Sequence, residues 1–292
     1  MPYSCLHQPV LDWYAHAARD LPWRAPDVSA WGVLVSEVML QQTPVSRVLP
    51  AYVDWLARWP TPQALAASPP GEAVRQWGTL GYPRRALRLH AAAVMITDLH
   101  DGRVPSEVEN LRRLPGVGVY TAAAVASFAF QQRHAVVDTN VARVLARAVG
   151  GGDRARAQPG AEERRQADDL LPDDPAAAAR WAVALMELGA LVCVARAARC
   201  QQCPIAPQCR WRATGGSTTG APRTSRSRSY AGTDRQCRGR LLGVLRASDA
   251  PVPAQALAAS WDDPAQRARA LGSLVSDGLI EPLADGRFRL PA

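Results

Sequence analysis

Apolar residues along the first 212 positions recur with the spacing of amphipathic or buried helices, and no run alternates as a half-buried strand would. Breaks rich in proline and glycine, such as residues 59–62 and 68–71, separate these stretches and mark loops. The pattern therefore predicts a mainly α fold. Helices are expected, among others, at residues 31–40, 50–58, 86–99, 120–130, 141–149 and 176–192.

The last 80 residues follow a different pattern. Residues 213–234 are rich in Gly, Ser, Thr and Arg and show no core pattern, which predicts a flexible basic linker. Beyond it, helical patterns at 239–246, 254–259 and 264–277 precede two short apolar segments around Asp285-Gly286. Three helices followed by a hairpin resemble a winged helix, a fold that serves either DNA binding or protein contacts. Both alternatives stay open here.

The length of 292 residues suggests two domains, with room for a small third. All 34 basic residues are Arg, which excludes mechanisms that need a side-chain Schiff base or a phosphate-loop Lys. Residues 196–240 hold ten Arg and one acid, whereas the remainder is nearly neutral despite a net charge of +8. This local excess indicates contact with a polyanion, and a merely solvated linker is the alternative.

Targeting and membrane signals are not evident. The N-terminal 20 residues have no basic start and no continuous apolar run, so we expect no signal peptide. The longest apolar stretch, about residues 119–130, falls short of the roughly 20 residues that span a bilayer. Four of the six cysteines crowd between positions 193 and 209, which predicts a reducing cytoplasm and a metal site rather than a disulfide framework.

The four clustered cysteines are spaced C-x6-C-x2-C-x5-C. Four thiolates this close favour zinc or an iron–sulfur cluster, and zinc sites usually have two separated close pairs. The 6-2-5 spacing resembles that of the endonuclease III family, where it holds a [4Fe–4S] cluster. The resemblance implies that Arg196 and Arg199, in the six-residue loop, contact phosphate. The predicted ligands are Cys193, Cys200, Cys203 and Cys209, whereas Cys5 and Cys237 are expected to be inert.

A glycine-rich turn, LPGVG at residues 114–118, lies between two helical patterns. Gly116 and Gly118 permit a tight turn whose backbone N–H groups face an anion at a helix N-terminus. Such a pair alone often marks only a turn. Followed by a helix of small residues, it resembles the helix–hairpin–helix signature of the same superfamily.

Two carboxyl groups have contrasting expected environments. Glu37 is the one ionisable residue in an apolar helix, and burial would favour its protonated form, as a proton donor requires. Asp138 precedes a helix and is expected to cap it, with the helix dipole favouring its anion. An acid and an anion are the pair needed to cleave a glycosidic bond through an oxocarbenium-like state.

Further segments carry a closer resemblance. The segments are LPWR at 21–24, SEVMLQQT at 36–43, WGTLGY at 77–82, VDTNV at 137–141 and ELGA at 187–190. With the hairpin and the cysteines, they make the first 212 residues similar to adenine DNA glycosylases of the MutY type. That family removes adenine mispaired with 8-oxoguanine or guanine in duplex DNA, and the resemblance implies a monomer that flips the base.

The resemblance implies a role for each matching residue. Glu37 would protonate N7 of adenine and help to activate water, and Asp138 would stabilise the cationic sugar with support from Tyr120 and Asn140. Arg19, Trp23 and Leu40 would line the adenine pocket. Without the resemblance, core packing would be the preferred interpretation of Trp23, Leu40, Leu80 and Met186. The residues expected to fill the gap in the duplex and contact 8-oxoguanine are Gln41, Gln42, Thr43, Leu80 and Tyr82.

This sequence departs from the family pattern at several positions. Val183 stands where a Gln or Glu is usual, Pro83 replaces a second Tyr, and Thr139 replaces a frequent Gly. The tail is shorter than the Nudix-like domain of many relatives and lacks its Phe-Ser-His loop. Recognition of 8-oxoguanine is therefore expected to depend more on the catalytic domain or to be weaker.

The sequence predicts four structural parts and leaves three candidate functions for the protein. We expect a cluster domain at 1–22 and 134–212, a six-helix domain at 23–133, the linker at 213–234 and a winged-helix-like domain at 235–292. The rivals to an adenine glycosylase are a thymine or uracil mismatch glycosylase and a catalytically idle iron–sulfur DNA-binding protein. Glu37 within MLQQT favours adenine, and Tyr120 occupies the position of the nucleophilic Lys of endonuclease III.

Overall fold

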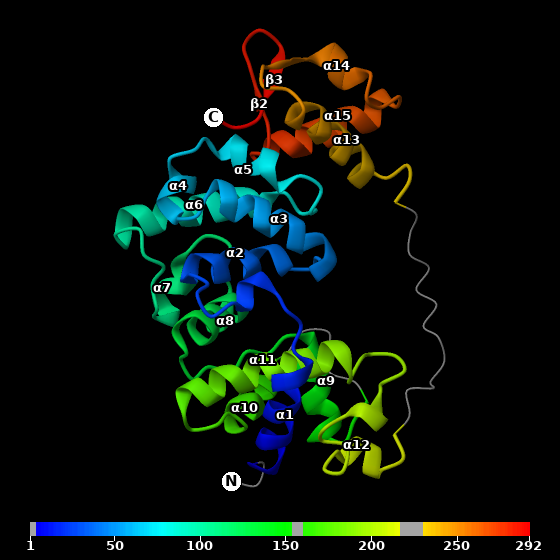
Figure 1. Ribbon diagram of the computed structural model, residues 1–292. Coiled ribbons are helices and arrows are strands. Elements are labelled where there is room, and N and C mark those ends of the chain that lie inside the picture. The colour runs from blue at the N-terminus through cyan, green and yellow to red at the C-terminus, as the bar shows by residue number, and fades with distance from the viewer. Residues whose placement is uncertain (1–3, 154–159, 217–229) are drawn as a thin grey trace. The chain divides into compact units, whose positions relative to one another are not determined.

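The computed structural model describes residues 4–153, 160–216 and 230–292 (Figure 1). Most of the predicted linker, residues 217–229, lies outside this description, as does Met1. The described chain is mainly helical, as predicted, and separates into two compact units. The first comprises Met1–Leu34, Ser106–Arg112 and Val117–Arg223, and the second comprises Val35–Pro105, Arg113–Gly116 and Thr224–Ala292. No helix of the described residues is long and apolar enough to cross a membrane.

The first unit is built around a long helix, α11 (Pro175–Leu191), which packs against α1 (Ser4–Ala17), α8 (Val119–Phe130) and α9 (Thr139–Ala148). Its core includes Trp181, Leu185 and Leu188, which are almost completely buried. The smaller elements of this unit are η1 (Pro22–Arg24), α10 (Ala161–Asp169), η2 (Cys200–Gln202) and α12 (Arg210–Ala213).

The second unit contains four helices that surround the buried aromatic side chains of Trp55, Trp59 and Trp77. α6 packs against both α4 and α5, and α3 packs against α5. These elements are α3 (Val45–Arg58), α4 (Pro62–Ala66), α5 (Pro70–Trp77) and α6 (Arg84–Leu99). Two further helices, α2 (Ala30–Leu40) and α7 (Val108–Arg113), each belong partly to the first unit and partly to the second.

The C-terminal segment of the second unit has the element order of the predicted winged helix. α13 (Asp234–Arg246) packs on α15 (Pro264–Ser276), with α14 (Ala254–Ala258) between them in sequence. A three-stranded antiparallel sheet in the order β1-β3-β2 completes it, and Phe288 of the central strand pairs with Val252 and Pro282. The strands are β1 (Val252–Pro253), β2 (Glu281–Pro282) and β3 (Arg287–Arg289).

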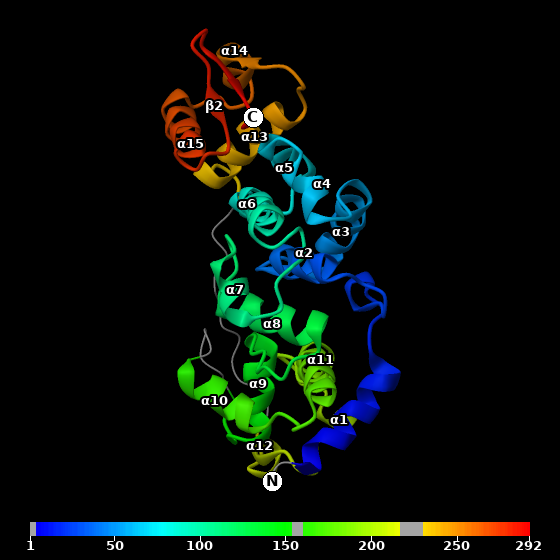
Figure 2. The same cartoon turned by 90° about the vertical axis from the view of Figure 1, so that its left-hand side faces the viewer.

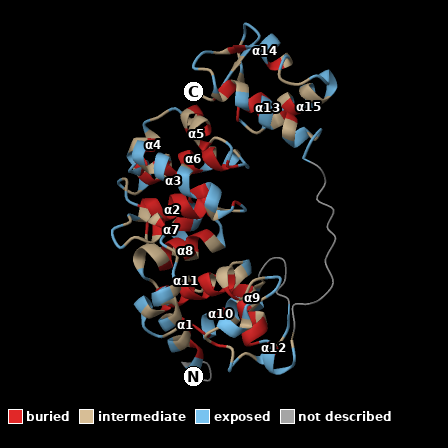
Figure 3. Cartoon of the chain, turned by 45° about the vertical axis from the view of Figure 1, so that its right-hand side comes forward, coloured by how far each residue is buried: buried red, intermediate tan, exposed pale blue. Residues whose placement is uncertain are grey.

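Two helices show how the sequence pattern acts locally. Every residue of α2 from Trp31 to Met39 is buried, because the helix is apolar on all its faces (Figure 3). α3 begins at Val45, five residues before the predicted start, and keeps Pro50 inside it. The prediction took Pro50 as a first-turn residue, which is where proline fits best. The apolar face of Val48, Tyr52 and Trp55 outweighs the backbone hydrogen bond that proline cannot make.

Candidate active site and cysteine pocket

Asp138 is held at the start of α9 by three hydrogen bonds. As predicted, it is the N-cap of that helix, and its Oδ1 accepts from the backbone N–H groups of Asn140 (2.9 Å) and Val141 (2.7 Å). Its Oδ2 accepts from Nδ2 of Asn140 at 2.7 Å. Nη2 of Arg143 donates in turn to Oδ1 of Asn140 at 2.8 Å. The carboxylate is therefore fixed by a chain of side chains on one helix turn.

The ionisation of Asp138 differs from the expectation. Burial raises the pKa of its carboxyl group, and the hydrogen bonds from Val141 and Asn140 and the charge of Arg143 offset that effect only in part. The helix terminus, which is visible in the sequence, favours the anion, whereas the depth of burial is set by the fold and favours the neutral acid. The Asp138 carboxyl group is thus held by three directed hydrogen bonds in a poorly solvated place, where a charge acts more strongly on its neighbours than in water.

Gly189 explains part of the ELGA segment. A Cβ atom on Gly189 would lie 2.7 Å from both Cβ and the carbonyl oxygen of Asn140, so α11 can pass the start of α9 only with glycine there. Nη2 of Arg143 donates to the carbonyl oxygen of Gly189 at 2.6 Å, which ties the same two helices together. The position of Asn140, and through it that of Asp138, depends on this close approach.

Gly189→Ala should markedly slow the reaction expected at Asp138 while the fold is kept. The new methyl group must push Asn140 away and so disturb the donors of Asp138, and misplacing a catalytic group by about 1 Å costs about 10²-fold in rate. Gly152→Ala is the matched control, because a Cβ at Gly152 meets no atom within 4 Å. Single-turnover rates for both variants test the prediction, and equal rates would refute the positioning role.

Glu187, the first residue of ELGA, is completely buried and anchors two arginines. Arg19 binds it through Nε and Nη2, each at 2.7 Å, and Arg24 donates to Oε2 at 2.9 Å. Burial by itself would raise the pKa of Glu187, but the hydrogen bonds from Arg19 and Arg24 outweigh it and lower the pKa to about 2. Arg19, expected in the adenine pocket, is thus already engaged by an anion, and Trp23 beside it in η1 is buried.

Tyr120 lies in the first turn of α8 and is half buried. It packs against a small core cluster formed by Ala124, Val136 and Ala182, together with Met186. Val136 lies two residues before Asp138 in the chain. The first unit thus contains five of the predicted site residues: Arg19, Trp23, Tyr120, Asp138 and Asn140.

Glu37 belongs to the second unit and lies in the middle of α2. It is 6 % exposed, with buried Val35, Val38 and Met39 around it in the helix. Burial of an acid is the condition that the predicted proton-donor role requires. Leu40, the last residue of this helix, is half buried.

Arg85 organises the residues expected to enter the duplex. Its guanidinium donates to the carbonyl oxygens of Val38, Met39 and Gln41 at the end of α2, to Oγ1 of Thr43, and to the carbonyl oxygen of Gly81. Burial lowers the pKa of Arg85 to about 10. One buried cation thus fixes two loops against each other.

These two loops display their residues unequally. Gln42 and Tyr82 are exposed and have positive φ values of 56° and 48°, which places both in a strained backbone region. Gln41 is half buried, whereas Thr43 and Leu80 are buried, and Oγ1 of Thr43 donates to the carbonyl oxygen of Leu80 at 3.4 Å. The exposed pair is thus available for contact, and the buried pair supports it.

The two hairpin glycines, Gly116 and Gly118, differ in backbone conformation and in the space around them. Gly116 has a φ of +82°, and a Cβ there would lie 3.0 Å from Cβ of Arg88. Gly118 caps α8, is exposed, and has open space where a Cβ would be. The backbone N–H groups that follow Gly118 therefore start a helix with room for an anion in front of them.

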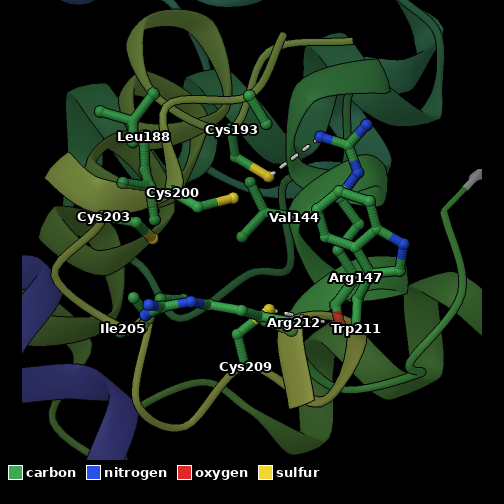
Figure 4. A pocket seen from close by; sticks show the side chains of 14 residues that line it. Val144, Arg147, Leu188, Cys193, Cys200, Cys203, Ile205, Cys209, Trp211 and Arg212 are labelled. Atoms are coloured by element: carbon green, nitrogen blue, oxygen red, sulfur yellow. Dashed lines mark hydrogen bonds between the residues drawn. The ribbon is translucent and has the colours of Figure 1, made fainter. Parts of the chain in front are cut away.

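The four predicted cysteine ligands line one pocket in the first unit. Figure 4 shows the side chains of Cys193, Cys200, Cys203 and Cys209 around a common space, with Leu188, Ile205 and Trp211 completing the wall. Within the described ranges, no three His, Cys, Asp or Glu side chains are grouped so that they could hold a single metal ion. Burial raises the pKa of Cys203 to about 11 and raises that of Cys193 as well.

Arg147 fastens the loop that carries these cysteines. Its side chain is 2 % exposed, lies over the ring of Trp211 and donates to Sγ of Cys193 at 3.5 Å and to the carbonyl oxygen of Val194 at 2.8 Å. Arg196 and Arg199, in the same loop, are exposed and form no ion pair with any described residue. Their charges are thus free to meet a phosphate.

Three arginines that hold these segments together were not predicted from the sequence, namely Arg85, Arg143 and Arg147. All three are buried or half buried and bond mainly to backbone oxygens. The sequence carried no signal for Arg143 and Arg147, because both fall on the polar side of the α9 pattern, opposite Val141 and Leu145.

Comparison with known proteins decides the family. Residues 35–167 match the model of the HhH-GPD superfamily of base excision DNA repair proteins. The adenine DNA glycosylase of Mycolicibacterium smegmatis is 56 % identical over 96 % of this chain and 94 % of its own length. The chain belongs to the adenine DNA glycosylases. It is therefore a base excision repair enzyme that hydrolyses N-glycosyl bonds in DNA and releases adenine.

More distant relatives cover 70 % of this glycosylase. The adenine DNA glycosylase of Homo sapiens is 42 % identical over 70 % of this chain and 38 % of its own length. A solved thermostable thymine-DNA glycosylase has a TM-score of 0.64 at 26 % identity and covers 70 % of this chain and 94 % of its own. The helix–hairpin–helix glycosylase fold is thus confirmed.

Proposed function

We propose that this glycosylase excises adenine mispaired with 8-oxoguanine or guanine, after flipping the adenine out of the duplex. Flipping is required because the glycosidic bond cannot be reached inside the base stack. The observation that carries the proposal is the buried Glu37 in the apolar helix α2, directly ahead of the exposed Gln42 loop. Exposed Gln42 and Tyr82 support it, because they are free to occupy the vacated space.

Two carboxyl groups carry the proposed chemistry. Glu37 protonates N7 of adenine, which makes the base a better leaving group, and then helps to activate water. Asp138, held by Asn140 and Val141, stabilises the cationic sugar that forms as the bond breaks. Arg19, Trp23 and Leu40 are proposed to line the adenine pocket, with Arg19 oriented by Glu187.

We also propose that Cys193, Cys200, Cys203 and Cys209 hold a [4Fe–4S] cluster. Their thiols line one pocket, and thiolates are the ligands that such clusters take. When bound, the cluster would supply structural support to the loop between Cys193 and Cys209. Arg196 and Arg199, presented by this loop, and Gly116 and Gly118 of the hairpin are proposed to contact DNA phosphates.

The organisation of the molecule follows from these roles. We propose a monomeric, cytoplasmic enzyme with a cluster domain at 1–22 and 134–212, a six-helix domain at 23–133, a linker at 213–234 and a winged-helix-like domain at 235–292. The absence of any Lys supports simple hydrolysis without a covalent enzyme–DNA intermediate.

A panel of duplexes tests the substrate. A, T or U is placed opposite guanine or 8-oxoguanine, and release of the base is measured under single-turnover conditions. We expect release of adenine alone, from duplexes that pair it with guanine or 8-oxoguanine. Release of thymine or uracil at a comparable rate would support the mismatch glycosylase alternative, and no release of any base would support an idle DNA-binding protein.

A further inference from the structure

The second unit contains a large groove that the catalytic residues do not account for. One side is formed by residues of the six-helix region, including Arg47, Arg84 and Arg88, and the other by α13, including Arg235, Arg238 and Arg240. Its volume is about 1240 Å³, larger than the roughly 300–1,000 Å³ of a small-molecule pocket. Gln42 and Tyr82 lie in the same groove. We call it the basic groove.

The C-terminal segment is held against α5 by hydrogen bonds to backbone carbonyl oxygens. The N–H of Gly71 donates to the carbonyl oxygen of Pro291 at 2.8 Å, and Nε of Arg246 donates to the carbonyl oxygen of Val74 at 2.9 Å. Arg75 donates to the carbonyl oxygens of Arg246 and Ser248. Figures 1 and 2 both show α13 next to α5 and α6. This docking places α13 along one wall of the basic groove.

The arginines that line the groove are only partly neutralised by acidic residues. Arg84 and Arg238 share Asp277, the one acidic residue that lines the groove, at 3.3 and 2.6 Å. Arg88, Arg235 and Arg240 are exposed and form no ion pair with the described residues. Unpaired cations on both walls create a positive potential that a polyanion would neutralise.

Two exposed tyrosines also line the basic groove. Tyr82 and Tyr230 line the groove and are 52 % and 55 % exposed, although they come from opposite walls. Exposed tyrosines among arginines are typical of surfaces that bind a nucleic acid backbone, where phenol groups donate to phosphate and sugar oxygens.

We propose that the basic groove binds the sugar–phosphate backbone of duplex DNA beside the Gln42 and Tyr82 loops, with the docked C-terminal domain supplying one wall. The proposal rests on the proposed function for its ligand, and it gives the C-terminal domain a role in holding DNA. Because it is a backbone contact, it acts on damaged and undamaged duplex alike.

The first test removes the free charges of α13. Arg235→Ala/Arg240→Ala should raise the Kd for a duplex about 10-fold and lower the slope of log K against log salt by about 1.8, because two phosphate contacts are lost. Arg269→Ala/Arg287→Ala is the matched control, because both residues are exposed on the same domain, are paired with Asp234 and Asp285, and do not line the groove. It should change the Kd less than 2-fold.

The outcomes separate the groove from the proposed function. Equal Kd values and salt slopes for the wild type and Arg235→Ala/Arg240→Ala would contradict DNA binding by the basic groove. An equal loss of affinity in both double variants would contradict it as well. A loss confined to the A:8-oxoguanine duplex would also overturn it, because the groove would then read the lesion. Release of adenine by the wild-type protein is measured in parallel, so failure of the proposed function is seen independently of binding.

A second test asks whether the docked position matters. Gly71→Ala places a Cβ 2.4 Å from the carbonyl oxygen of Pro291 and should displace the C-terminal domain, whereas Gly272→Ala meets nothing within 4 Å. Gly71→Ala should raise the Kd, and adding Arg235→Ala/Arg240→Ala should then raise it little further. Wild-type affinity of Gly71→Ala, or full additivity, would show that the walls do not act together.

Discussion

Glu37→Gln should slow adenine release by about 10²–10⁴-fold while binding to an A:8-oxoguanine duplex stays near wild-type strength. The amide has nearly the same shape as the acid but cannot donate a proton to N7, so the base would have to leave as a poor leaving group. Glu37 is 6 % exposed in α2, and bulk water therefore has little access to replace it as the proton donor. Single-turnover rates at saturating enzyme measure the effect.

Glu109→Gln is the matched control for this loss. Glu109 is exposed on α7, so the same substitution there should leave the rate within 2-fold of the wild type. Adenine release by Glu37→Gln at more than a tenth of the wild-type rate would contradict the role of Glu37 as the proton donor.

Cys203→Ser should lose both iron and most of the folded protein. Cys193, Cys203 and Cys209 pack against the main core of the first unit, and a ligand loss would leave the loop between Cys193 and Cys209 without its support. Structural metal sites contribute on the order of 10 kcal/mol to folding, and small domains that contain one are often unfolded without the metal. Iron and sulfide content, visible absorbance and yield of folded protein measure the effect.

Cys5→Ser is the matched control, since Cys5 is exposed in α1 and lies outside the cysteine pocket. It should keep wild-type iron content and a brown colour. A colourless wild-type protein with one bound zinc ion would contradict the cluster, as would full iron content in Cys203→Ser.

The helices were predictable where the apolar pattern is continuous. α2, α8 and α11 begin within one residue of the expected positions, because each combines small or apolar residues with a clear break before it. β1 was missed, because Val252–Pro253 is too short to show alternation and exists only through its pairing with β3. Such a strand is set by tertiary contact rather than by local sequence.

Two local features of the candidate site were predictable from the sequence, whereas its electrostatics were less so. Burial of Glu37 and the N-cap at Asp138 follow from the sequence, since each depends on its own helix. The raised pKa of Asp138 and the hydrogen bonds donated by Arg85 could not be predicted, because they depend on packing between segments distant in sequence. The groove that involves α13 was likewise invisible, since it needs the contacts of Gly71 and Arg246.

The fate of the DNA strand tests the central claim most directly. Wild-type enzyme is incubated with an A:8-oxoguanine duplex, with and without borohydride, and released adenine, strand cleavage and covalent adduct are quantified together. Because the chain has no Lys and Tyr120 cannot form an imine, we expect adenine release and an intact abasic strand that is nicked only by added alkali or heat. A borohydride-trapped adduct in a yield that matches turnover, or no adenine release at all, would contradict hydrolysis by Glu37 and Asp138.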